Sequence, residues 1–307
     1  MTRIADLSQS QLIQSYIADT QARLQASQIQ VSTGQKAQRY AGIADQADIL
    51  VNLESTKARV SQYVANNKIV TSRLSAMDGA LSQLTSIATQ AKTLLVNASN
   101  ADNASQMALN QQAQNLLNQV AGLLNTKFGD MYLFGGTRVD APPVDLNAAG
   151  YSAPGPSYPS NVDTGYFQGD STKVVTRAAD NFDVTYGVTA DEGGFEELIR
   201  SLQLASTTTV SPTIDRNRLK DSLDVLNEAI GDLPAIAARI GAAQSAIDQS
   251  SAEHNALSTY LDQSITDIKA VDVPMALTQL SSDQTVLQAA YMTTVRLNGL
   301  SLVQYMH

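Results

Sequence analysis

The chain has 307 residues, a formal net charge of −9 and no cysteine. This length allows two or three domains with a sizeable buried core. The acidic balance argues against nucleic acid and anionic membrane surfaces, because both bind clusters of Lys and Arg. The lack of cysteine excludes disulfide bonds, thiolate metal sites and a cysteine nucleophile.

The first 44 residues predict an amphipathic helix and a short irregular segment. Residues 1–8 contain no apolar core of the kind found in a secretory signal peptide, so we expect no cleavable signal. The helical pattern has spacings of three and four residues, typical of a helix that buries one narrow face against a partner. Its members are Ile13, Ile17, Thr20, Leu24, Ser27 and Val31.

A longer stripe begins at Ile49 and continues to Ala98, with apolar residues at alternating intervals of four and three. This spacing predicts one helix of about 50 residues, roughly 75 Å long, in a left-handed supercoil. Asn67 interrupts the stripe, and a polar residue at such a position either fixes the register or is a mild defect facing a neighbouring helix. A shorter stripe at 109–123 predicts a helix that folds back after a turn near residues 100–103.

Residues 131–194 differ from the rest and predict an inserted β-rich surface domain. All five Phe of the chain and ten of its 17 Gly lie between positions 128 and 195, so we expect a small aromatic core within the insertion. β-Branched and aromatic residues at 173–177 and 182–188 predict two strands. The Pro-, Gly- and Ser-rich segment at 141–163 is too long for a simple connection and is expected at the surface.

The remaining residues return to the helical pattern. A short stripe at 219–230 precedes a longer one. Pro274 predicts a break between residues 271 and 274, because Pro removes a backbone hydrogen bond and clashes with the preceding turn. The longer stripe comprises Ile236, Ile240, Ala243, Ile247, His254, Leu257, Leu261, Ile268, Val271 and Met275. The last stripe comprises Leu277, Leu280, Leu287, Tyr291, Val295 and Leu302.

These elements predict a mainly α fold, in which the N- and C-terminal segments form a long antiparallel helical coiled-coil bundle with a small inserted β-rich domain. We divide the chain into three parts. Residues 1–44 with 271–307 form a terminal coiled-coil module, 45–130 with 195–270 form the long-helix bundle, and 131–194 form the insertion. The terminal stripes are too short to be stable alone, so they need partners.

The chain offers few residues for catalysis, and the sequence predicts that it is not an enzyme. It contains no His/Asp/Glu spacing typical of a metal site, no phosphate-binding glycine loop and no nucleophile motif. His254 is expected to line a helical seam, with a pH-sensitive register switch as the alternative. Asp191 and Glu192, followed by two glycines, predict a turn before a helix that begins near Phe195 rather than a calcium site. We therefore predict no catalytic residue, cofactor or metal.

Several segments resemble the bacterial flagellin family. The run Val-Ser-Thr-Gly-Gln-Lys at 31–36 follows the first helix, and an Asn pair at 66–67 lies in the long second helix. Arg-Ile-Gly-Ala-Ala-Gln at 239–244, together with residues 264–272 and 287–306, is similar to the family's C-terminal segments. Together these segments cover both terminal thirds of the chain in the family's order.

Residues 129–137, Gly-Asp-Met-Tyr-Leu-Phe-Gly-Gly-Thr, resemble the hook-associated branch of this family. Flagellins usually carry a different turn at this point. The corresponding subfamily motif comprises Tyr132, Leu133, Phe134, Gly135, Gly136 and Thr137. One departure lies at residues 39–45, where the family more commonly carries a (Pro/Ser)-x-Asp-Asp-Pro turn.

The resemblance implies a structural adaptor of the bacterial flagellum at the junction of hook and filament. A short flagellin is the alternative within the family, and a helical secretion-system or coiled-coil interaction protein is the alternative outside it. The resemblance implies export through the flagellar type III apparatus without a cleaved signal, an extracellular location, and termini that are disordered in the monomer and order on assembly.

The expected partners follow from the same resemblance. They are further copies in a helical ring, a hook-associated protein on the hook side, flagellin on the filament side, and a secretion chaperone on the C-terminal helix. We predict no nucleic acid and no membrane partner. The residues predicted for the assembly interface are Ile13, Ile17, Leu24, Val31, Leu277, Leu280, Leu287, Tyr291 and Leu302.

Overall fold

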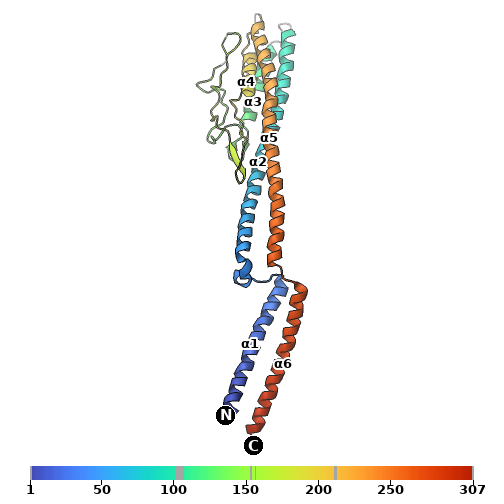
Figure 1. Cartoon of the computed structure of the whole chain (residues 1–307). Coiled ribbons are helices and arrows are strands. Elements are labelled where there is room, and N and C mark those ends of the chain that lie inside the picture. Colours follow the sequence, from blue (N-terminus) through green and yellow to red (C-terminus); the bar gives the residue numbers. More distant parts are fainter. Residues whose placement is uncertain (1, 101–106, 153, 156, 211–212, 306–307) are drawn as a thin grey trace. The chain divides into compact units, whose positions relative to one another are not determined.

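The computed structural model describes residues 2–100, 107–152, 154–155, 157–210 and 213–305; at 2–10, 107 and 297–305 it describes the backbone alone. Its fold is mainly helical with a small strand region, as the sequence predicts (Figure 1). The helices are α1 (Thr2–Thr33), the short 3₁₀ helix η1 (Tyr40–Gln46), α2 (Ala47–Asn100), α3 (Met107–Leu124), α4 (Gly193–Ser206), α5 (Arg216–Lys269) and α6 (Val273–Tyr305). The strands are β1 (Lys127–Phe128), β2 (Met131–Tyr132), β3 (Val175–Ala179) and β4 (Phe182–Thr185).

The chain forms two compact units. The first contains residues 1–59 and 257–307, and the second contains residues 60–256. Each boundary falls inside a long helix, α2 or α5. The three-part domain division made from the sequence stays a prediction. Among the described residues, no helix is long and apolar enough to cross a bilayer.

The long second helix is present as one continuous element, α2, and its apolar stripe is buried from Val60 to Ala98 except at the half-buried Tyr63. At the start of the stripe the prediction is wrong, because Ile49 is exposed and the neighbouring Leu50 is fully buried. The turn expected near residues 100–103 lies largely outside the described residues. The helix expected to follow it is α3, which buries Leu109 in the same core.

Pro234 and Pro274 have different effects on the two C-terminal helices, α5 and α6. Pro234 lies inside α5 on its exposed side, so the stripes at 219–230 and from Ile236 belong to one helix. The break near Pro274 is confirmed, because α5 ends before it and α6 begins at Val273. Asp272 starts α6 as its N-cap, since its Oδ1 accepts a hydrogen bond from the Met275 backbone N–H at 3.0 Å. Two residues assigned to the α5 stripe, Leu257 and Met275, are exposed.

The second unit has one hydrophobic core to which the insertion contributes. Residues of α2, α3, α4 and α5 pack in one cluster with Phe134 and Tyr166 of the insertion. Phe134 meets Phe195 of α4 edge to face, with ring centroids 5.7 Å apart. The expectation of a separate aromatic core is therefore wrong. Two-stranded ribbons are too small to bury a core alone, so their aromatic side chains pack against the helices.

Strands β3 and β4 form an antiparallel pair close to the two predicted segments, with Val175 opposite Thr185. The register shifts between Arg177 and Ala179, and the backbone carbonyl oxygen of Ala178 lies at this shift. This oxygen accepts hydrogen bonds from Asn67 Nδ2 at 3.2 Å, Ser250 Oγ at 2.9 Å and His254 Nε2 at 2.9 Å. Three side chains of α2 and α5 thus hold the β3–β4 hairpin through one backbone atom.

This contact gives Asn67 and His254 structural roles. Asn67 is fully buried, and it binds the hairpin rather than a neighbouring helix. The His254 ring is half-buried and stacks on Tyr63 of α2, with centroids 5.2 Å apart. The neutral imidazole can donate through Nε2, so this contact does not require a charged histidine.

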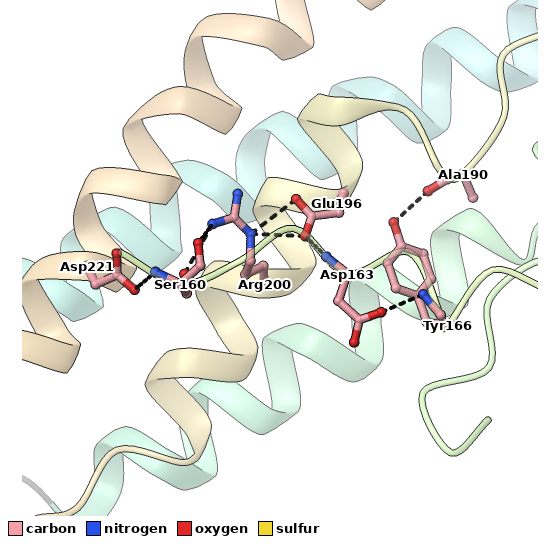
Figure 2. Close-up of polar contacts among 8 residues, drawn as sticks. Ser160, Asp163, Tyr166, Ala190, Glu196, Arg200 and Asp221 are labelled. Atoms are coloured by element: carbon pink, nitrogen blue, oxygen red, sulfur yellow. Dashed lines mark hydrogen bonds and ion pairs between the residues drawn. The ribbon is translucent and has the colours of Figure 1, made fainter. Parts of the chain in front are cut away.

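A buried ion pair on α4 holds the segment 160–166 through hydrogen bonds to its backbone (Figure 2). Arg200 Nε and Glu196 Oε1, one turn apart on α4, are 2.9 Å apart. Arg200 also donates to the Ser160 carbonyl at 3.1 Å, and Glu196 accepts from the Asp163 backbone N–H at 3.0 Å. A buried charge pair is tolerable only when further hydrogen bonds satisfy it. Here the loop backbone supplies those bonds.

Residues 133–137 form a tight turn after β2. Leu133 and Phe134 are buried, and Gly136 has φ of +70°. A Cβ on Gly136 would overlap the carbonyl oxygen of Asp170. The Asp170 carboxylate in turn accepts hydrogen bonds from the Thr137 hydroxyl at 2.6 Å and from the Thr137 backbone N–H. The hydroxyl is the main reason why the pKa of Asp170 is lowered to about 2.

A group of carboxylates lies between α4 and α5. Burial, together with the negative charges of Asp232, Glu228 and Glu196, raises the pKa of Glu197 to about 7. Within the described part of the chain, Glu197 Oε2 has no hydrogen-bond partner. The charged form of Glu197 is therefore disfavoured in the folded protein.

Gly136→Ala should destabilise the second unit by more than about 2 kcal/mol, because the left-handed conformation and the overlap with Asp170 both oppose a side chain. Gly129→Ala is the matched control. Gly129 also has a positive φ, of +61°, but has open space around its Cβ position, so only the backbone cost of roughly 1 kcal/mol applies. Denaturant unfolding measures both variants. Equal losses would contradict the close approach to Asp170.

Glu197 should make the protein less stable as the pH rises. Its folded pKa, about 7, exceeds the ordinary value of 4.5, so the folded state binds the proton more tightly. The resulting stabilisation is complete below the ordinary pKa and is lost as the pH rises through the folded one. Glu197→Gln should remove this slope in denaturant unfolding between about pH 5 and pH 8. The exposed Glu253→Gln is the control, and equal slopes in the two variants would contradict the assignment.

Candidate assembly interface

The terminal helices are joined to the rest of the first unit by two paired backbone segments. Gln35 and Ala270 form an antiparallel bridge. The Lys36 N–H donates to the Lys269 carbonyl at 2.7 Å, and the Val271 N–H donates to the Gly34 carbonyl at 2.9 Å. The segment that follows α1 and the segment that precedes α6 are therefore held together by main-chain hydrogen bonds.

Gly34 ends α1 in the conformation that this pairing requires. Its φ is +69°, and its N–H donates to the Gln30 carbonyl at 2.8 Å. A left-handed residue after the last turn is a common helix C-cap, and glycine adopts it without strain. The Val-Ser-Thr-Gly segment thus marks the end of the first helix.

The segment that departs from the family's usual turn forms η1 and carries a polar contact of its own. The Tyr40 hydroxyl donates to Glu54 Oε2 at 2.8 Å, and Lys269 Nζ donates to Glu54 Oε1 at 2.7 Å. The Lys269 hydrogen bond is the main cause of a lowered pKa for Glu54, and the hydrogen bond with Glu54 raises the pKa of Tyr40. Gly42 packs on Ala37 too closely for a Cβ.

Helices α1 and α6 form an antiparallel hairpin, with both chain ends at the same end of the pair (Figure 1). Among the described side chains of the two helices, four are buried: Thr20, Ser27, Ala276 and Asp283. Large apolar side chains reach at most a half-buried state in this seam. The hairpin thus buries small and polar groups.

Large apolar side chains instead lie on the outside of the hairpin. On α6, Met292 and Val295 are 65 % and 71 % exposed. The exposed set continues on both helices and comprises Leu12, Tyr16, Ile29, Val273, Met275, Leu277, Val286 and Tyr291. Scattered apolar residues are normal on a surface, but such a concentration on one small hairpin is typical of a surface that other proteins cover.

The structure places the predicted interface residues in three groups. Half-buried positions on the seam are occupied by Ile13, Ile17, Leu24, Val31, Leu280 and Leu287. Leu277 and Tyr291 lie at or beyond the edge of the seam, 48 % and 46 % exposed. The Tyr291 hydroxyl still accepts a hydrogen bond from Gln21 of α1 at 2.6 Å. The side chain of Leu302 lies outside the described residues.

The α6 seam is rotated from the one expected. It follows Ala276, Leu280, Asp283, Leu287, Ala290 and Thr294, whereas the sequence pattern favoured the larger residues Leu277 and Tyr291. The predicted stripe was built from large apolar residues, so it did not include the alanines or the buried Asp283 of the observed seam. The available signal was in α1, where Thr20 and Ser27 already place small polar residues at seam positions.

The subfamily motif is part of the second unit's core and surface turn. Leu133, Phe134, Gly135 and Gly136 are buried, Tyr132 is half-buried and Thr137 is exposed. The motif residues therefore build the turn against Asp170 described above. Within the described residues, no group of three or more His, Asp or Glu side chains could hold a metal ion.

Comparison with known proteins gives matches at both ends of the chain. Residues 4–138 match the bacterial flagellin N-terminal helical region, and residues 223–306 match the bacterial flagellin C-terminal helical region. Flagellar hook-associated protein 3 of Escherichia coli is 24% identical over 304 residues, and that of Salmonella typhimurium is 23% identical over 303. Each alignment covers 94% of both chains.

Solved structures share the fold. Bacillus cereus FlgL superposes with a TM-score of 0.53 at 18% identity, over 73% of this chain and 99% of the other. Xanthomonas campestris FlgL gives 0.54 at 14% identity, over 69% and 98%. Together the two matched regions span more than two thirds of the sequence. The chain belongs to the bacterial flagellin family.

Proposed function

We propose that this chain is a structural subunit of the bacterial flagellum, an adaptor at the hook–filament junction, and that it has no catalytic activity. The observation that carries the proposal is the terminal hairpin, which leaves Met292, Val295 and other large apolar residues exposed. Flagellin-family membership and relatives named hook-associated protein 3 support the same role. They also favour a junction protein over a short flagellin.

The terminal hairpin is the proposed assembly interface. Its half-buried seam residues and its exposed apolar residues would be covered by neighbouring subunits, which are further copies in a helical ring, another hook-associated protein on the hook side and flagellin on the filament side. The fully buried positions of this seam are small or polar and its large apolar residues are only half-buried, so it supplies limited hydrophobic stabilisation. We therefore infer that the terminal helices order fully only on assembly.

The same weak seam supports export before folding. We propose passage through the flagellar type III apparatus without a cleaved signal, to an extracellular position in the flagellum. A secretion chaperone would cover the C-terminal helix beforehand, because the exposed apolar residues of α6 favour aggregation when unprotected.

Deleting the gene should leave hooks without filaments and release flagellin into the medium, because the first flagellin subunits would lack their docking surface. Electron microscopy of the cells and immunoblotting of the medium measure the two effects. Immunogold labelling of the complemented strain should give one band at the joint. Label along the whole filament would favour a short flagellin, and normal filaments in the deletion strain would contradict the proposal.

Replacing both Met292 and Val295 by Ser should impair assembly without unfolding the second unit. Burying such side chains contributes about 1.5–3 kcal/mol each, so the double variant should restore filaments at least about tenfold less often than the wild type. Val162→Ser is the matched control, because Val162 is a similarly exposed residue in the insertion. Equal filament counts for all three proteins would show that this face of α6 is not an interface.

A further inference from the structure

The rotation of α6 in the terminal hairpin is not the one that the hydrophobic effect alone would select. The seam buries Ala276 and Asp283, while Leu277, Tyr291 and Val295 lie on one flank of the helix. These three residues are called the outer stripe below. Turning α6 about its axis would bring the outer stripe into the seam and move Asp283 toward water. Taken alone, both changes would favour the turned hairpin, so another contact must oppose the turn.

A polar layer holds α6 in the observed rotation. Arg23 Nε lies 3.5 Å from Asp283 Oδ1, and Arg23 Nη2 donates to the Thr20 hydroxyl at 3.2 Å. Gln279 Nε2, one turn earlier on α6, donates to the same Asp283 oxygen at 3.1 Å. The polar layer is defined as Thr20, Arg23 and Asp283. It links a seam position of α1 to a seam position of α6.

The layer is incomplete as a stabilising contact. Asp283 is 2 % exposed, and among the described residues its Oδ2 has no hydrogen-bond partner. The Arg23 side chain is 57% exposed, so water screens much of its attraction for the carboxylate. A buried acid that is only partly paired contributes little net stability, but turning α6 would separate Asp283 from Arg23, so the layer still opposes the turn.

We propose that the polar layer is a specificity determinant for assembly. It fixes α6 in the rotation that keeps the outer stripe available for neighbouring subunits, and it keeps the free hairpin weak until those subunits bind. This inference rests on the proposed assembly role of the hairpin. It assigns that control to Asp283, to its partner Arg23 on α1, and to Thr20, which accepts a hydrogen bond from Arg23.

The first test is the stability of the hairpin in the full-length monomer. Asp283→Leu removes the buried acid and adds an apolar seam residue. Amide hydrogen exchange of the described parts of α1 and α6 should therefore slow by on the order of tenfold or more. Asp19→Leu is the matched control on the exposed side of α1, and it should leave exchange unchanged. Unchanged or faster exchange in Asp283→Leu would overturn the proposal.

A coupling experiment tests the partnership with Arg23. Arg23→Met leaves Asp283 without its cation, so exchange should become several-fold faster in the wild-type background. In the Asp283→Leu background the same change should have little effect, because the carboxylate is absent. Equal effects of Arg23→Met in both backgrounds would show that the two residues do not act together.

The second test is assembly in a strain that lacks the gene. Asp283→Leu should be stable and exported yet restore filaments at least about tenfold less often than the wild type, since the polar contact that selects the observed rotation is then absent. Full restoration together with slowed exchange would overturn the inference while leaving the assembly role intact. If the wild-type gene is not needed for filaments, the proposed function itself fails.

Asp283→Asn separates charge from burial. The amide keeps the size and hydrogen bonds of the layer but removes the charge, so it should hold the observed rotation and restore filaments nearly as well as the wild type. Loss of filaments in Asp283→Asn equal to that in Asp283→Leu would contradict a role for the polar contact in setting the rotation.

Discussion

The apolar seam of α2 between Val60 and Ala98 is the constraint on which the second unit depends. A helix this long is not stable in water by propensity alone, so each turn needs a packing partner. Helices α3, α4 and α5 supply those partners in one continuous core. The insertion then adds Phe134 and Tyr166 to the same core. Its position is fixed by the helices, and its short strands contribute little stability of their own.

The first unit follows a different principle. Its long-range order comes from main-chain pairing between residues 34–36 and 269–271 and from the contacts of Glu54 with Tyr40 and Lys269. Its terminal seam is narrow and partly polar. Within one chain, a well-packed core and a weak hairpin therefore coexist. This difference is the physical basis for assigning the hairpin to assembly and the second unit to a preformed scaffold.

The sequence predicts the parts that rest on repeated local patterns. The heptads of α2, the break before Pro274 and the two strands near residues 175–185 all have short-range signals. The Ala178 contact has none, because its acceptor is a backbone oxygen and its donors come from two distant helices. The α6 rotation was missed for a related reason. It depends on Arg23 and Asp283, 260 positions apart, and not on the size of nearby apolar residues.

The role of the Ala178 carbonyl affects how the insertion can change. Every residue type has a backbone oxygen, so Asn67, Ser250 and His254 recognise a position and not a side chain. Substitutions along the outer faces of β3 and β4 leave that recognition intact, provided that a small residue occupies the fully buried position 178. The β3–β4 hairpin can therefore change in sequence while its hydrogen bonds to α2 and α5 are kept. It is a suitable place to graft a foreign loop onto the scaffold.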